Sequence, residues 1–285
     1  CAVLLASCEA LRQPVKDEQY MTEMPPMSVA IDQYASSSYT ESQVWSDSSV
    51  SSASASSATL VHTLSKGSHR TFRVPIVMYH YIRPLPEHDP LGVGLSVTPE
   101  TFDHQLDVYA QKGYSTIGFA NLVNTGSALP SKPIILTFDD GYEDAFTEAF
   151  PKLYAHHMKG TFYIITGFVG KPGYVTWDQL HAMTASGMEI AAHTVNHFEL
   201  SKLPEEKQSY QITKSISTLE QTLGIRIHSV AYPAGRYNEE TIKVMHKTSV
   251  PFAVTTRAGV ATGHMNPYEL PRVRVNNKTD MEKTF

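Results

Sequence analysis

Short apolar runs alternate with stretches of helical periodicity along the chain from Val74 onward. After the run at 133–138, for example, Ala145, Ala149 and Leu153 recur at helical spacing. Strands that alternate with helices predict parallel βαβ units and an α/β fold. Seven or so strands in roughly 210 residues predict a barrel smaller than the regular eight-stranded one. The predicted strands lie at 74–81, 114–119, 133–138, 160–168, 188–194, 228–233, 252–257 and 270–275.

Capping residues mark where several predicted helices begin. Thr98 followed by Pro99 predicts a helix start, because threonine caps well and proline suits the first helical position. Thr176 and Gln179 have the spacing of a capping box. Pro151 is expected to kink or restart the helix in which it lies, because it lacks the N–H that a helix interior needs.

The first 70 residues have a different pattern. Residues 1–8, "CAVLLASC", are apolar and do not begin with Met, so the true start is expected to lie upstream. Leu5-Ala6-Ser7-Cys8 resembles a bacterial lipobox, which implies the end of a lipoprotein signal peptide with acyl chains on Cys8. A chance apolar stretch is the alternative. Residues 9–70 are rich in Ser and Ala and predict a disordered tether. The folded domain would span 71–285, held outside the cytoplasm on a bacterial membrane, at the cell surface or in the periplasm.

Composition narrows the classes of partner and site. The chain has 285 residues, of which 41% are hydrophobic and 18% charged, and this suits one globular domain with non-globular sequence attached. The net charge of -5 and the lack of basic blocks argue against a nucleic-acid partner. Both cysteines, Cys1 and Cys8, lie at the N-terminus, so a metal site in the body must use histidines and carboxylates.

Polar side chains gather where the predicted strands end. Asp139 and Asp140 follow the strand at 133–138, while His80 and His193 lie near the ends of two others. In parallel α/β folds the chemistry collects at the carboxyl ends of the strands. An Asp-Gly turn with Asp140 as a polar cap is the simpler interpretation of the aspartate pair. The alternative is a site that uses the two carboxylates differently.

The segment "HTVNH" places two histidines four residues apart. If the chain makes one helical turn there, His193 and His197 face the same way. Two imidazoles and one carboxylate leave a coordination position open for water, which is the usual plan of a catalytic zinc site. A pair of surface or capping histidines is the alternative. The strand-end position favours a metal, with one aspartate as its ligand and the other as a base.

Two motifs now indicate a family. "TFDDG" (137–141) and "HTVNH" (193–197) resemble those of the NodB-type polysaccharide deacetylases, the fourth carbohydrate esterase family. The resemblance covers residues 74–275 and implies a distorted (β/α)7 barrel, the NodB-homology fold. It implies Asp139 as the catalytic base and Asp140, His193 and His197 as ligands of a divalent metal, zinc first, with cobalt, nickel or manganese also open. "YPAG" (232–235) implies that Tyr232 and Pro233 lead to Ala234, whose N–H holds the oxyanion.

The sequence departs from the family pattern at two places. Ala231 stands where the family has an arginine that orients the base, so Arg272 is the first substitute and Arg236 the second. A surface salt bridge is the alternative role for Arg272. The family's C-terminal Leu-x-His is absent, and "VMYH" resembles instead the branch that deacetylates poly-N-acetylglucosamine. That resemblance implies His80 as the general acid, with a core histidine as the alternative and His264 as a weaker candidate.

The resemblance implies a hydrolase that removes N-acetyl groups from an N-acetylglucosamine polymer such as exopolysaccharide, peptidoglycan or a chitin-like glycan. An O-acetyl esterase acting on a xylan-like polymer and a non-catalytic carbohydrate-binding domain are the alternatives. Tyr232, Trp177 and Tyr142 are candidates for stacking on sugar rings, although Trp177 is expected in the core because it lies in the first turn of a helix.

Overall fold

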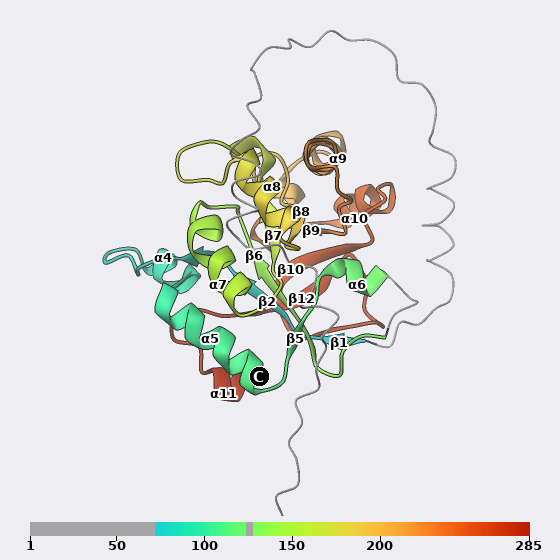
Figure 1. The fold of residues 1–285 in the computed structure, drawn as a ribbon. Helices are drawn as coiled ribbons and strands as arrows, with labels where there is room; N and C mark the ends of the chain where they lie inside the picture. The colour runs from blue at the N-terminus through green and yellow to red at the C-terminus, as the bar shows by residue number, and fades with distance from the viewer. Residues whose placement is uncertain (1–71, 124–127) are drawn as a thin grey trace, which may run out of the picture.

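The computed structural model describes residues 72–123 and 128–285. These residues form a closed ring of parallel strands with helices around it (Figure 1). The strands follow the order β2-β12-β10-β9-β8-β7-β6, and β2 pairs with β6 to close the ring. The short strand β5 (Ser115–Thr116) lies beside the start of β6. This confirms the predicted distorted barrel of seven strands. The ring strands are β2 (Ile76–Tyr79), β6 (Pro133–Phe138), β7 (Thr161–Ile164), β8 (Glu189–Ala192), β9 (Ser229–Ala231), β10 (Phe252–Ala258) and β12 (Leu270–Arg274).

Helices cover the outside of the ring. In Figure 1, α8, α9 and α10 lie along one side, and α5 and α7 lie along another. The long helices are α5 (Pro99–Gln111), α8 (Trp177–Ala185), α9 (Glu205–Leu223) and α10 (Glu239–His246). The shorter ones are α4 (Pro90–Leu95), α6 (Phe119–Val123), α7 (Phe150–Ala155) and α11 (Met281–Thr284), with the single turns η1 (Ala145–Ala149), η2 (Thr166–Phe168), η3 (Leu200–Lys202) and η4 (Pro233–Gly235).

The predicted helix starts are confirmed by their caps. The Thr98 side chain accepts a hydrogen bond from the Thr101 N–H, and both bonds of the capping box between Thr176 and Gln179 are present. Pro151 restarts its helix as expected. A π-helical turn, η1, precedes it, and α7 carries Pro151 in its first turn.

The apolar run at 74–81 is not one strand, as predicted, but three. β1 (Arg73–Val74) pairs antiparallel with β11 (Ala261–Thr262), β2 joins the ring, and β3 (Tyr81–Ile82) pairs with β4 (Ser96–Val97). Pro75 separates the first two because it has no N–H to continue a ladder of hydrogen bonds. The chain leaves the ring at His80, which turns that residue from a strand position into a rim position.

The interior of the ring changes character along its axis. Toward the amino ends of the strands it is filled by apolar side chains, among them Ile76, Ile135 and Leu270. Toward the carboxyl ends the same inward-facing positions become polar, since Thr137 and Asp139 follow Ile135 at intervals of two and Arg272 follows Leu270. The polar residues of the predicted site therefore lie at the carboxyl end of the ring, directly above a layer of apolar side chains that fills its interior.

Within 72–123 and 128–285, no helix combines the length and apolar character that a membrane crossing requires. The predicted lipobox at Cys8 and the tether at 9–70 lie outside the described residues.

Candidate active site

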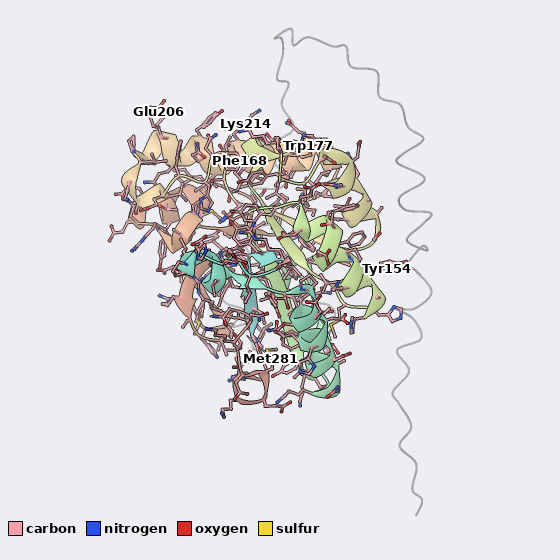
Figure 2. All side chains as sticks on the ribbon, turned by 90° about the vertical axis from the view of Figure 1, so that its left-hand side faces the viewer. Tyr154, Phe168, Trp177, Glu206, Lys214 and Met281 are labelled. Atoms are coloured by element: carbon pink, nitrogen blue, oxygen red, sulfur yellow. The ribbon has the colours of Figure 1, made fainter. Side chains whose placement is uncertain are left out.

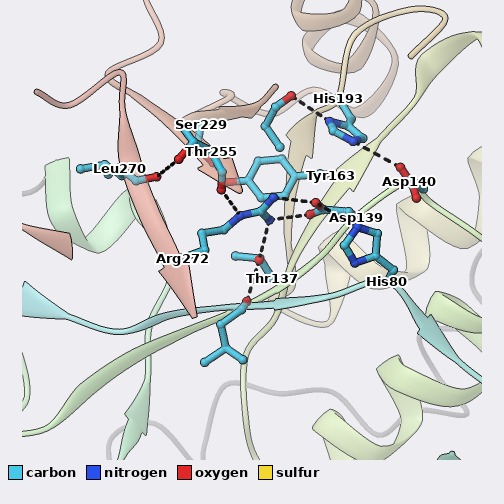
Figure 3. A network of polar contacts seen from close by, with 12 residues as sticks. His80, Thr137, Asp139, Asp140, Tyr163, His193, Ser229, Thr255, Leu270 and Arg272 are labelled. Atoms are coloured by element: carbon cyan, nitrogen blue, oxygen red, sulfur yellow. Dashed lines mark hydrogen bonds and ion pairs between the residues drawn. The ribbon is translucent and has the colours of Figure 1, made fainter. Parts of the chain in front are cut away.

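Three candidate ligands converge above the ring. Asp140 follows β6, and His193 and His197 follow β8, two strands away. The Nε2 atoms of both histidines lie 3.3 Å from the same oxygen, Oδ1 of Asp140. One ligand atom from each of the three residues lies within 4.8 Å of the others. The juxtaposition inferred from the two motifs is therefore present. Figure 3 shows the Asp140 and His193 part of this cluster.

The two ring nitrogens of His193 face different partners. Its Nδ1 lies 2.8 Å from the carbonyl oxygen of Ala231, which can only accept, so Nδ1 carries the proton. The other ring nitrogen, Nε2, faces Asp140 Oδ1, a buried oxygen without a hydrogen-bond partner among the described residues. Burial lowers the pKa of His193, but the carboxylates of Asp140 and Asp139 raise it by more. The geometry therefore favours a positive charge between these atoms, and the donor set fits a divalent metal.

The loop that carries the two histidines is not the helical turn expected from their spacing. Thr194 and His197 have positive φ angles of 65° and 58°. The His197 N–H donates to the Thr194 hydroxyl at 3.1 Å. From α9, the side-chain oxygen of Gln211 accepts from the N–H groups of Val195 and Asn196. The imidazoles converge because this clamp folds the loop, and not because of helical periodicity.

Asp139 faces the ring interior and meets Arg272 there. Arg272 donates from Nη1 to Oδ1 and from Nη2 to Oδ2 of Asp139, both at 2.7 Å. Both residues are buried, with 1% of Arg272 and 3% of Asp139 exposed, so the alternative of a surface salt bridge does not fit. Burial raises the pKa of Asp139, but the ion pair with Arg272 lowers it by more. Asp139 is therefore held ionised and fixed in orientation.

Arg272 is itself held by three neighbours from other strands. Its Nε donates to the Thr255 carbonyl at 2.9 Å, and Nη1 also donates to the Thr137 hydroxyl at 3.1 Å. The Tyr163 ring lies 5.8 Å from the guanidinium carbon. Arg236, the second candidate for this role, is exposed in the turn after β9. The structure thus places Arg272, and not Arg236, against Asp139.

His80 lies at the rim on the other side of Asp139. Its Nε2 is 3.8 Å from Asp139 Oδ2, and 14% of its side chain is exposed. Burial lowers the pKa of His80, and the nearby carboxylates of Asp139 and Asp140 reverse only part of this effect. His264 lies in an exposed turn after β11, which pairs with β1 at the amino end of the ring. It is therefore at the wrong end of the barrel to act in this site.

The turn after β9 supplies the candidate oxyanion donor. Pro233 is buried, while Ala234 is exposed and has a positive φ of 52°. The Ala234 N–H has no acceptor among the described residues, so it is available to a ligand. The same strand end positions His193, through its bond to Ala231.

None of the three candidate aromatic residues offers a free face at the site. Tyr232 is completely buried, and its hydroxyl donates to the Tyr268 carbonyl at 3.0 Å. Its prediction as a substrate residue is wrong, because Ala231 faces inward and Tyr232 therefore faces the outer core. Tyr142 is stacked by Tyr81 at 4.2 Å and by Tyr174 at 5.2 Å between ring centroids. Trp177 packs on the core in the outer helical layer, as expected (Figure 2).

Strained backbone concentrates at this site. Of the five non-glycine residues with positive φ in the described chain, four belong to it, namely Asp140, Thr194, His197 and Ala234. Each such residue costs on the order of 1 kcal/mol, so a fold retains it where the surroundings demand it. Strain of this kind was not expected from the sequence, since none of these positions is a glycine.

The chain is similar in sequence and in structure to known proteins. Residues 126–253 match the family model described as polysaccharide deacetylase. YxkH of Bacillus subtilis, which is provisionally named a polysaccharide deacetylase, is 34% identical to this chain over 207 residues. The match covers 72% of each chain. A poly-β-1,6-N-acetyl-D-glucosamine N-deacetylase of Staphylococcus epidermidis is 26% identical, over 64% of this chain and 68% of that one. The deacetylase PplD of Streptococcus pyogenes, solved with acetate, superposes with a TM-score of 0.70 and 30% identity, over 75% of this chain and 96% of that chain.

Proposed function

The chain belongs to the polysaccharide deacetylase family, and from this premise we propose that it removes N-acetyl groups from an N-acetylglucosamine polymer with the help of a divalent metal. The observation that supports the proposal most is the convergence of acceptor atoms from Asp140, His193 and His197 beside the ion pair of Asp139 and Arg272. Such a cluster is costly to build in an interior unless a cation occupies it.

Asp140, His193 and His197 would hold the metal. Two imidazoles and a carboxylate suit zinc first, while cobalt, nickel and manganese accept the same donors. The bond from His193 Nδ1 to Ala231 orients the ring, as the outer partners of metal-bound histidines do. When bound, a divalent cation supplies a polarised carbonyl and a water of lowered pKa.

Asp139 is the proposed proton acceptor for the attacking water. Because Arg272 holds its pKa well below the usual range, Asp139 is ionised at every pH of interest but is a weak base. Its part is therefore to orient the attacking water and to accept the proton that the water gives up. The Ala234 N–H would donate to the oxygen that becomes negatively charged as the water adds to the acetamide carbon.

His80 is the proposed acid at the leaving nitrogen. As the C–N bond breaks, the nitrogen takes a proton from the His80 imidazolium, and acetate and a sugar amine are released. The lowered pKa of His80 makes the imidazolium a stronger acid, while it reduces the protonated fraction at neutral pH.

The Staphylococcus epidermidis relative suggests poly-β-1,6-N-acetylglucosamine as the first substrate to test. Acetate release is measured from that oligomer, from chitin oligomers, peptidoglycan and acetyl-xylan. The assay is run with a chelator and after zinc, cobalt, nickel or manganese is restored. We expect release from an N-acetylated glycan, its loss with the chelator, and recovery with metal. Release from acetyl-xylan alone would indicate the O-acetyl esterase, and glycan binding without any release would indicate a binding domain.

Single substitutions test the assigned roles. Asp139→Asn is expected to lower kcat by at least 100-fold, and His80→Ala by a similar or smaller factor. His104→Ala, at an exposed position on α5, is the matched histidine control and should leave kcat unchanged. Full activity of Asp139→Asn would refute the mechanism, whereas full activity of His80→Ala would refute only its role as acid.

We also propose that Cys8 carries a lipid that anchors the enzyme to a bacterial membrane, outside the cytoplasm. The support is the lipobox-like run Leu5-Ala6-Ser7-Cys8. Mass spectrometry of the N-terminal peptide should show an acylated Cys8, and Cys8→Ala should release the protein from the membrane fraction. An unmodified Cys8 within a longer peptide would contradict the proposal.

A further inference from the structure

Arg274 is an arginine at the site to which neither the motifs nor the proposed mechanism assigns a role. It ends β12, two residues after Arg272, so strand alternation places it on the same inward face and nearer the mouth. It pairs in register with Met78 of β2, and His80 lies two residues further along the chain, just past the end of that strand. Strand geometry puts the Cα atoms of Arg274 and His80 about 8 Å apart, which an arginine side chain spans.

The other charges of the site are already paired. Both oxygens of Asp139 accept from Arg272, and Asp140 faces the two histidines. Arg274 is exposed, and in the part of the chain that the structure describes it has neither a hydrogen-bond acceptor nor an ion-pair partner. It is thus a guanidinium without a counter-charge at the mouth.

The charge of Arg274 affects the pKa of His80, and Arg274 is itself affected by Asp139. Burial is the main cause that lowers the pKa of His80, and Arg272 and Arg274 add to it. Burial and the charge of Arg272 also lower the pKa of Arg274, which Asp139 raises. Arg274 therefore lies within electrostatic range of Asp139 and of the histidine that faces the leaving nitrogen.

The proposed reaction changes the charge of the substrate at this point. An N-acetyl group is neutral, whereas the sugar amine that remains binds a proton and becomes a cation. On the basis of the proposed function, we propose that Arg274 is a specificity-determining residue that disfavours sugar units with a free amine. Arg274 tolerates the neutral acetamide and repels the cationic amine. The product therefore dissociates from the site, and units that are already deacetylated bind less well.

The size of the effect follows from the distance and the solvent. For a charge separation on the order of 8 Å, which we take from the spacing of the Arg274 and His80 Cα atoms, two like charges change an equilibrium constant by roughly twofold to tenfold in surroundings between a protein surface and water. Salt screens the interaction, because the Debye length is about 10 Å at 0.1 M ionic strength. The discrimination should therefore weaken as salt is added.

The test compares inhibition by a fully deacetylated glucosamine oligomer with the KM for the acetylated oligomer of equal length. In the wild-type enzyme, the ratio of inhibition constant to KM should fall as salt rises. In Arg274→Gln it should be twofold to tenfold lower at low salt and nearly independent of salt, while Arg274→Lys should resemble the wild type. Arg226→Gln removes an exposed arginine before β9, at the opposite end of the barrel, and is the matched control.

Two results would overturn the inference. One is a ratio that neither salt nor Arg274→Gln changes. The other is an Arg274→Gln variant that loses affinity for the acetylated oligomer instead of gaining it for the amine, which would make Arg274 a hydrogen-bonding residue. If Arg274→Gln fails to fold, the salt series on the wild type decides. Absence of acetate release by the wild type would count against the proposed function, and release with an unaltered ratio against this inference alone.

Discussion

Two aspartates that are neighbours in the chain have opposite surroundings. Strand alternation points Asp139 into the ring, where Arg272 neutralises it at 2.7 Å. Asp140 adopts a positive φ of 76°, and its Oδ1 turns toward His193 and His197. The adjacent carboxylates thus face different partners, the Arg272 guanidinium for Asp139 and the two imidazoles for Asp140.

Replacing Arg272 should expose how much Asp139 depends on it. Arg272→Met leaves a buried carboxylate without a counter-charge, so we expect a loss of about 3–5 kcal/mol in the free energy of unfolding. We also expect kcat to fall by at least 100-fold, because the base loses its orientation. Urea unfolding and acetate release measure the two effects. The double variant Asp139→Asn/Arg272→Met should be more stable than Arg272→Met alone; if it is not, the ion pair is not the source of the loss.

The sequence predicts the residues that form this site, but not the neighbouring residues that hold them in position. Asp139, Asp140, His193 and His197 belong to two recognisable motifs, and Arg272 was inferred because Ala231 replaces the usual arginine. Thr137, Thr255 and Tyr163 hold Arg272 from three strands, and the register that brings them together is a long-range property. Tyr232 was assigned wrongly because its motif position says nothing of the face on which its side chain lies.

At the scale of the element, β8 carries a buried acid at the end opposite the site. Glu189 begins this strand with 13% of its side chain exposed. Its Oε1 lies 3.8 Å from Nδ1 of His228, and neither atom has a hydrogen-bond partner among the described residues. Burial raises the pKa of Glu189 to about 7, and the N–H groups of Ala120 and Phe119 offset this only in part. Burial, followed by the charge of Arg226, lowers the pKa of His228, so His228 does not supply a counter-charge at neutral pH.

Glu189 should make the fold less stable as the pH rises. Its pKa is higher in the folded state than the usual 4.5, so its contribution is fully present below pH 4.5 and is lost as the pH passes through about 7. The full loss is about 3 kcal/mol at most. Urea unfolding of the wild type and Glu189→Gln between pH 5 and 8 isolates this contribution. A difference between the two proteins that does not vary with pH would refute the assignment.

Local signals predicted element boundaries where the cause is local. The cap at Thr98 and the capping box at Thr176 involve residues three apart, so the sequence contains both partners. The prediction of one strand at 74–81 is wrong because the three pieces of this run pair with different strands, β11, β6 and β4, that come later in the chain. Apolar character predicts burial in a strand, but it does not predict which strand lies beside it.

At the scale of the whole molecule, the ring closes between the two ends of the folded part. β2 is the first strand of the ring along the chain and β12 is the last, and they pair in parallel through Val77 with Val273 and Met78 with Arg274. Such a closure joins residues about 200 positions apart, which makes it slow to form and cooperative once formed. The apolar runs predict a small barrel of seven or so strands, and the family resemblance implies seven, whereas the pairing that closes the ring is seen only in the folded chain.

Removal of β12 should abolish the fold and not merely weaken it. A chain ending at residue 268 leaves β10 and β2 with unpaired edges and removes the counter-charge of Asp139. We expect no cooperative thermal transition for that chain. A chain ending at residue 279 loses only α11 and should still melt cooperatively, at a lower temperature. Circular dichroism measures both, and a cooperative transition in the shorter chain would contradict the essential role of closure.

The position of Arg272 on the last strand has a consequence for the life of the chain during synthesis. Asp139, Asp140, His193 and His197 all leave the ribosome before Arg272 does, so a growing chain contains the proposed metal ligands and the proposed base long before it contains the arginine that fixes Asp139. Until β12 inserts, Asp139 lacks its arginine partner and the ring of strands is not closed. We therefore expect hydrolytic activity to appear only after the last strand is in place. Activity of this chain would then report that the barrel is completely folded.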